Sequence, residues 1–225
     1  APEHLLGEAR PTARHNEPDR AHLVAGAVGE LGAHLDPGIG ASGHRIEGNA
    51  TSELTNDPLP DSDGGMRLEG SSSNEIIDND ISDAGDAAIQ ILLGSDDNVI
   101  TGNTAVRSSD YALTIDASSG TRVIDNVFHL TGGAAISLGS ADDGVITGND
   151  VRFNPGGIQV DGSSGNRIEG NDARQSGAEG ISVGGPSFGN EIVGNLVSFT
   201  GASGIALEVD AAGAAGNLIE DNEAN

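Results

Sequence analysis

The residues best suited to chemistry form a column of three along the chain. His129, Arg152 and Arg174 each follow an Asn by three residues, at intervals of 23 and 22 residues. If the chain repeats at that spacing, the three side chains point outward and stack about 4.8 Å apart. Stacked guanidinium groups can bind and neutralise the carboxylates of a uronate chain, which lowers the cost of removing the C5 proton.

A longer turn, VRSSDYA, precedes this column and adds Arg107 and Tyr111, the only Tyr of the chain. Arg107, Arg152 and Arg174 are therefore candidate substrate-binding residues for an acidic polysaccharide. His129 and Tyr111 are the candidate catalytic base or acid. The alternative interpretation is that these residues are solvated strand positions that offset a very acidic surface.

The composition limits the possible partners. The chain has 35 acidic and 10 basic residues, lacks Lys, and has a formal net charge of −25 at pH 7. Nucleic acid and anionic membrane surfaces are disfavoured partners, because both are polyanions. Such a surface is typical of halophilic proteins, whose self-repulsion is screened by salt. An acidic secreted protein from a GC-rich genome is the alternative.

Two classes of feature are missing from the sequence. There is no Cys, which excludes disulfides and thiolate metal sites. No apolar run approaches the roughly 20 residues that a membrane-spanning helix needs, so no membrane span is expected.

A repeat supplies the elements that must position the candidate residues. Stretches such as HRIEGN, NVITGN and NEIVGN recur, each closing on an Asn, at intervals of 22 to 30 residues. The residue before that Asn is always Gly or Asp, types that tolerate the positive φ of a sharp corner. The closing residues are Asn49, Asn79, Asn103, Asn126, Asn149, Asn171, Asn195 and Asn222.

Within each repeat the apolar residues alternate with period two, as in strands with one buried face. A second apolar pair precedes each closing motif, such as Ile136/Leu138 and Ile158/Val160. A repeat of this length holds three short strands and three turns, which is one coil of a parallel β-helix. We therefore predict an all-β solenoid of about eight coils, with stacked Asn side chains forming a ladder.

These motifs resemble the right-handed parallel β-helix repeat proteins, which include pectate-lyase-like enzymes, alginate epimerases and lyases, and NosD-like periplasmic proteins. The resemblance covers residues 36–225, which we predict to be the β-helix domain, and it implies a right-handed coil. It is specific for the fold, whereas the matching residues are core and turn positions that carry no chemistry.

The two ends of the solenoid need cover, because they expose strand edges and apolar core. Residues 1–35 are predicted to be an irregular N-terminal segment. Leu23, Ala27, Leu31 and Leu35 lie near helical spacing, which indicates a short helical cap within 17–35. The C-terminus stops on a repeat boundary, so we expect further repeats or a partner to cover that end.

Motifs of the related enzymes are incomplete. Alginate epimerases carry Asp-Pro-His-Asp, whereas here Asp36-Pro37 is followed by Gly38. Asp116 and Asp161 share an outward column two coils apart, a pair that chance explains among so many acidic residues.

No metal cofactor is predicted, with weak calcium binding at single turns as the remaining candidate. Asp96/Asp97 and Asp142/Asp143 lie two coils apart, too far to share one calcium ion. A copper site of the NosD type calls for clustered His or Met. Five of the six His lie between positions 4 and 44, in the least regular part of the chain, and Met66 occupies a core column.

The sequence thus predicts an extracellular or cell-surface protein that interacts with carbohydrate, on a uronate lyase- or epimerase-like scaffold. Whether it is an enzyme stays open at this point. The first alternative is a non-catalytic structural solenoid or surface module of a longer protein. The second is a NosD-like accessory protein.

Overall fold

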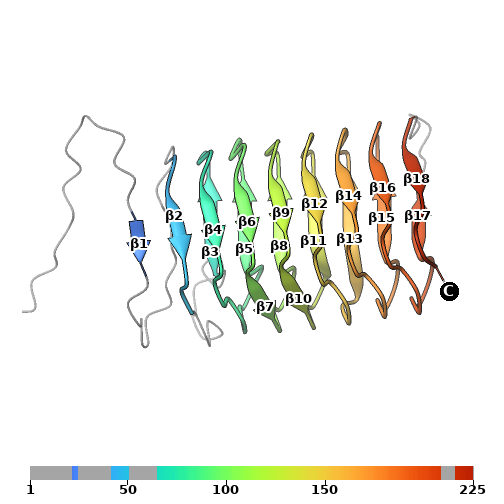
Figure 1. The fold of residues 1–225 in the computed structure, drawn as a ribbon, viewed down its shortest axis with the longest axis horizontal. Coiled ribbons are helices and arrows are strands. Elements are labelled where there is room, and N and C mark those ends of the chain that lie inside the picture. Colours follow the sequence, from blue (N-terminus) through green and yellow to red (C-terminus); the bar gives the residue numbers. More distant parts are fainter. Residues whose placement is uncertain (1–21, 25–41, 51–64, 209–215, 225) are drawn as a thin grey trace, which may run out of the picture.

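The computed structural model describes residues 22–24, 42–50, 65–208 and 216–224, and within them the chain is a β-solenoid. Two parallel sheets run along its length with a short third sheet of two strands beside them, and successive coils are stacked side by side (Figure 1). This confirms the predicted all-β parallel solenoid. No helix is present in the described ranges, and accordingly none could span a membrane.

The first sheet contains the repeated motif. Eight of its nine strands end two residues before a closing Asn, so all eight copies form the same element. In order, the strands are β1 (His22–Val24), β2 (Arg45–Glu47), β4 (Glu75–Ile77), β6 (Val99–Thr101), β9 (Arg122–Ile124), β12 (Val145–Thr147), β14 (Arg167–Glu169), β16 (Glu191–Val193) and β18 (Leu218–Glu220).

The second sheet contains the other apolar pairs, and a third sheet of two strands closes the coil. The second sheet consists of β3 (Met66–Glu69), β5 (Ile89–Leu92), β8 (Leu113–Asp116), β11 (Ala134–Gly139), β13 (Gly156–Asp161), β15 (Ile181–Gly184) and β17 (Ile205–Leu207). The third pairs β7 (Thr104–Val106) with β10 (Val127–His129). Isolated parallel bridges continue this third row past Asp150 and Asp172.

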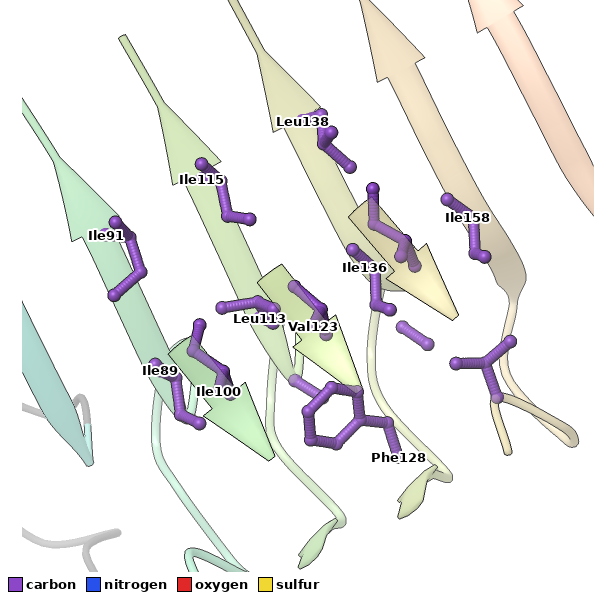
Figure 2. Packing of buried hydrophobic residues seen from close by; sticks show 14 of the residues in the cluster. Ile89, Ile91, Ile100, Leu113, Ile115, Val123, Phe128, Ile136, Leu138 and Ile158 are labelled. Atoms are coloured by element: carbon purple, nitrogen blue, oxygen red, sulfur yellow. The ribbon is translucent and has the colours of Figure 1, made fainter. Parts of the chain in front are cut away.

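The core lies between the sheets and is built from columns of aliphatic side chains. Ile136 and Ile158 are in register on adjacent strands, and both are at most 1% exposed. Figure 2 shows these side chains stacked with their neighbours, with Phe128 entering from the third sheet. Burying each such side chain contributes roughly 1.5–3 kcal/mol, so the stacked columns hold the coils together.

The predicted asparagine ladder is confirmed and is continuous from Asn49 to Asn222. Asn126 is typical: its backbone N–H and its Nδ2 both donate to Oδ1 of Asn149, at 3.0 and 2.9 Å. The same Nδ2 donates to the carbonyls of Ile100 and Ile124. Each buried amide therefore satisfies backbone groups of two coils, which an apolar residue at this corner would leave unpaired.

The corner before each ladder Asn has the positive φ expected from its Gly or Asp. Asp125 has φ 52° and Gly148, on the next coil, has φ 67°. A Cβ on Gly148 would lie 2.3 Å from Oδ1 of Asp125, so a larger residue at this corner would force the Asp125 side chain to move. Sequence and stacking thus constrain each other at this corner.

The helical conformation predicted for the N-terminal cap is wrong in the one part of it that the structure describes. His22–Val24 form strand β1, which pairs in parallel with β2. The open edge of β2 offers unpaired backbone groups, and a strand satisfies them directly whereas a helix would not. The rest of the predicted cap within 17–35 lies outside the described residues.

Candidate functional site

Four of the five predicted site residues gather around the third row of the solenoid, and three of them belong to a continuous chain of charges. We call the group His129, Asp150, Arg152, Asp172 and Arg174 the charged row. His129 ends β10, and the bridges between Val127, Asp150 and Asp172 place the other members on the next two coils. The predicted outward column is therefore present from His129 to Arg174, whereas the corresponding residue of the next coil, Ser198, is buried.

Basic and acidic side chains alternate along the charged row and contact one another. Arg152 donates to both carboxylate oxygens of Asp150, at 2.8 and 2.7 Å, and Arg174 donates in the same way to Asp172. Arg152 Nε also lies 3.5 Å from Asp172 across the coils. His129 Nε2 is 2.8 Å from Asp150 Oδ1, an ion pair when the imidazole is protonated, although not with the geometry of a directed hydrogen bond.

These contacts fix the charge states. Burial alone would raise the pKa of the Asp150 carboxyl, but hydrogen bonds from Arg152 and the contact with His129 lower that pKa to about 2. Hydrogen bonds to Asp150 and Asp172 raise the pKa values of Arg152 and Arg174 respectively. Two arginines and two aspartates therefore cancel, and a ligand carboxylate meets a row that is already neutralised.

An exposed aromatic ring lies beside the charged row. The Phe153 ring is 5.4 Å from Arg152 Cζ and meets the His129 ring edge-on, with centroids 5.7 Å apart. Phe153 has φ 63° and is 43% exposed. Arg107 comes one residue after Val106, which pairs with His129, but its guanidinium donates to Asp83 and makes no ion pair with the charged row.

Tyr111, the fifth predicted residue, faces a different surface. It lines a groove of about 510 Å³ on the outer face of the second sheet, and neither His129 nor the predicted arginines belong to that lining. The structure therefore does not bring the two candidate catalytic residues into one pocket. Polar lining residues of this groove, which sequence reasoning had not assigned to a site, are Gln159, Asp161, Glu179, Ser182 and Glu208.

Small residues on two coils create the groove. The register of the second sheet places Tyr111, Ala134, Gly156 and Glu179 in one column. The side chains of Tyr111 and Glu179 stand at the two ends, and Ala134 and Gly156 leave a hollow between them. Strands β11 and β13, the longest of the structure, carry these small residues as their first positions.

A carboxyl that the sequence did not single out lies behind Tyr111. A Cβ on Gly133 would lie 2.9 Å from Asp110 Oδ1 and 3.3 Å from the Tyr111 ring, so Gly133 keeps the space between them open. Burial, together with the nearby charge of Asp86, raises the pKa of Asp110. The only sign of this hollow in the sequence was the presence of two runs of small residues, Gly132-Gly133-Ala134 and Gly156-Gly157.

In each acidic pair considered for calcium, one aspartate accepts a hydrogen bond from a backbone N–H group of a neighbouring turn. Asp96 Oδ1 accepts from the backbone N–H of Ser119, and Asp142 Oδ1 accepts from that of Ser164, at 2.7 Å in both cases. Within the described ranges, no three His, Cys, Asp or Glu side chains are grouped to hold a metal ion.

The comparison with protein families identifies the repeat. The profile of the periplasmic copper-binding protein (NosD) family matches residues 40–225, which is most of the chain. The chain belongs to the NosD family. No curated protein sequence matches this NosD family member.

Solved structures with the same fold include several polysaccharide-modifying enzymes. The A-module of the mannuronan C-5 epimerase AlgE4 from Azotobacter vinelandii superposes with a TM-score of 0.67 and 15% identity, covering 82% of this chain and 52% of that one. The periplasmic alginate epimerase AlgG gives a TM-score of 0.63 and 17% identity, covering 81% and 44%. The chain thus spans about half the length of these structures, and at such identity the likeness establishes the fold alone.

The described residues do not fit the copper site that the family description implies. Met66 is fully buried in the core, and His129 faces Asp150. His44 and His129 lie on different coils, and the chain has no Cys. Copper ligands of the His, Met or Cys type are therefore not clustered in the described part of this NosD family member.

Proposed function

We propose that this protein binds a polysaccharide whose chain lies along the groove over β11, β13 and β15. The observation that carries the proposal is the groove itself, in which an aromatic side chain and neutral hydrogen-bonding groups face one hollow. Tyr111 offers a ring to stack on a sugar, and Gln159 and Ser182 offer an amide and a hydroxyl to its hydroxyl groups. Sugar sites need this mixture of flat apolar surface and directed polar groups.

The solenoid geometry supports a chain ligand. Successive strands lie about 4.8 Å apart, so each coil presents the same type of position at nearly regular intervals along the axis. Such an outward column of uncharged polar side chains consists of Thr114, Ser137, Gln159 and Ser182. The fold is shared with epimerases whose names refer to mannuronan and alginate, which is consistent with a polymeric ligand.

Binding without turnover fits the arrangement best. Catalysis on a uronate needs a base and an acid on the two sides of one carbon, both within reach of it. His129 belongs to the charged row and Tyr111 to the groove, so the two candidates do not converge on one ligand position. The family description and the name of AlgG point to the periplasm, and we place this protein outside the cytoplasm.

The test is calorimetric titration with neutral and acidic oligosaccharides, combined with a substitution that fills the groove. A Cβ on Gly156 makes only an ordinary contact of 3.4 Å with Ala134, so Gly156→Leu should fold and occupy the hollow. We expect it to weaken binding at least about tenfold, and Tyr111→Ala to do the same. Thr147→Leu, an outward position on β12 of the first sheet, is the matched control and should leave binding unchanged.

An acidic polysaccharide at the charged row is the second candidate, favoured by the stacking of Arg152 and Arg174 on adjacent coils. Their side chains are 32% and 38% exposed, so the guanidinium groups remain accessible. If oligouronates bind there, Arg152→Ala weakens binding by about 1.5–3 kcal/mol, the range of a charged hydrogen bond, and Gly156→Leu has no effect. Absence of binding by any oligosaccharide would favour the structural-solenoid alternative.

A further inference from the structure

The charge of the residues that line the groove indicates which charge its ligand should carry. Three carboxylates line it, those of Asp161, Glu179 and Glu208, and none of its lining residues is Arg, Lys or His. No described arginine or histidine forms an ion pair with any of the three, in contrast to Asp150 and Asp172 of the charged row. These groups are therefore available to a ligand.

The carboxylates are placed regularly along the solenoid. The register of the second sheet aligns Asp116, Gly139, Asp161 and Gly184 in one column. Glu208 extends that column, because it follows Leu207, the partner of Val183. Acidic residues thus alternate with glycines, and adjacent acids are two strands, or roughly 9.6 Å, apart. This is close to the repeat of two sugar units in an extended chain.

A fourth carboxyl lies next to the groove without lining it. Glu179 lines one end of the hollow, and Asp110 lies close to Gly133 at the other end, next to Tyr111. A uronate in this groove would place its carboxylates near these groups without any cation to compensate, so that like charges would repel each other at close range. The net charge of −25 adds to this repulsion.

We propose that the groove selects polysaccharides of neutral or amino sugars, and that it binds protonated amino sugars in preference to uronates. This inference rests on the proposed function and names its ligand class. Each ammonium group forms an ion pair with a carboxylate of the Asp161 column or with Glu179, while Gln159 and Ser182 hydrogen-bond to hydroxyls. The unpaired acids, which would be unfavourable near an anionic chain, then become the specificity determinants.

The experiment compares ligands that share one backbone and differ in charge. We would titrate the protein with an N-acetylated chito-oligosaccharide, with the same oligomer after removal of the acetyl groups, and with an oligouronate of equal length. At about pH 5.5 and low salt we expect the amino form to bind at least about tenfold more tightly than the acetylated form. The oligouronate should not bind in the groove.

Variants separate selection by the groove from general attraction to an acidic protein. The double variant Asp161→Asn/Glu179→Gln keeps the side-chain shapes and should reduce the preference for the amino form to about threefold or less. Asp142→Asn, outside the groove lining, still accepts from Ser164 and should leave the preference intact.

The outcomes distinguish this inference from the proposed function. Equal loss of preference in the Asp142→Asn control, or tighter binding of the oligouronate, would overturn the inference. If the acetylated and amino forms bind equally and Gly156→Leu abolishes both, the groove binds sugar and only the inference fails. If none of the three oligomers binds, the proposed function fails as well.

Discussion

The charged row and the groove are two surfaces of the same coils, and they differ in whether their carboxylates are paired with arginines. In the charged row, Asp150 and Asp172 each accept two hydrogen bonds from an arginine two residues further along the chain. In the groove, Asp161 and Glu179 have no cationic partner among the described residues. The same residue type therefore contributes to stability on one surface and remains available to a ligand on the other.

This difference shows why a column of cations is a poor guide to an anion site. A guanidinium that is already bidentate with a neighbour must exchange that partner for a ligand, so only the difference between the two interactions contributes to binding. A hollow lined by unpaired polar groups has no such competitor. Pairing within the protein has to be known before a charged surface can be assigned to a partner.

The largest expected effect tests which face of β13 belongs to the core and which to the groove. Ile158→Asp should lower the free energy of unfolding by more than about 3 kcal/mol, because an unpaired charge enters the shared core. Gln159→Asp, the next residue and exposed on the outer face, should change it by less than about 0.5 kcal/mol. Urea denaturation of both variants measures the contrast, and similar losses would mean that the two faces are misassigned.

The next effect concerns the charged row at acid pH. The pKa of Asp150 is lowered to about 2 in the folded protein, whereas the pKa of this carboxyl in the unfolded chain is near 4. Its ionised form therefore stabilises the fold fully at pH values above about 4. That contribution decreases as pH falls through about 4 to about 2. Because solvent screens this partly exposed group, Asp150→Asn should cost no more than about 1–2 kcal/mol at pH 7 and progressively less below pH 4.

Asp161→Asn in the groove is the matched control for this pH experiment, and it should lose almost nothing at any pH. Thermal unfolding of both variants from about pH 2 to about pH 7 provides the measurement. A constant deficit of the Asp150 variant across that range would contradict the assigned ion pairs.

A smaller effect distinguishes paired from unpaired arginines. Arg152→Ala should destabilise the fold by about 1 kcal/mol, because Asp150 remains partly buried without its bidentate partner and Phe153 loses a packing neighbour. Arg122→Ala, at an exposed position without a described carboxylate partner, should be nearly neutral. Chemical denaturation measures both, and equal losses would remove the distinction between the charged row and the remaining surface.

Salt should produce the smallest net change in stability, because it has two opposing effects on the folded protein. Screening weakens the ion pairs of the charged row but also reduces repulsion among the 35 acidic residues. Since acids far outnumber bases, we expect the melting temperature to rise between about 0.05 and about 2 M NaCl. A flat or falling melting temperature over this range would argue against the halophilic interpretation.

The sequence alone determined the coil, because the signals that specify it are local and periodic. Alternating apolar residues predicted the strands, and the spacing of Asn103, Asn126 and Asn149 predicted their stacking into one ladder. Gly or Asp before each Asn predicted the positive φ at the corner. The helical conformation predicted for the cap was wrong at His22–Val24, because these residues instead pair with the otherwise unpaired edge of β2.

The site depended on tertiary structure to a greater degree. The sequence placed His129, Arg152 and Arg174 in one column, and the period of two could also have shown that Asp150 and Asp172 share the face of their arginines. It could not show the groove, which needs small residues on two coils to lie between Tyr111 and Glu179. Repeat spacing fixes which residues stack, whereas a hollow depends on the side-chain volumes that the register brings together across neighbouring strands.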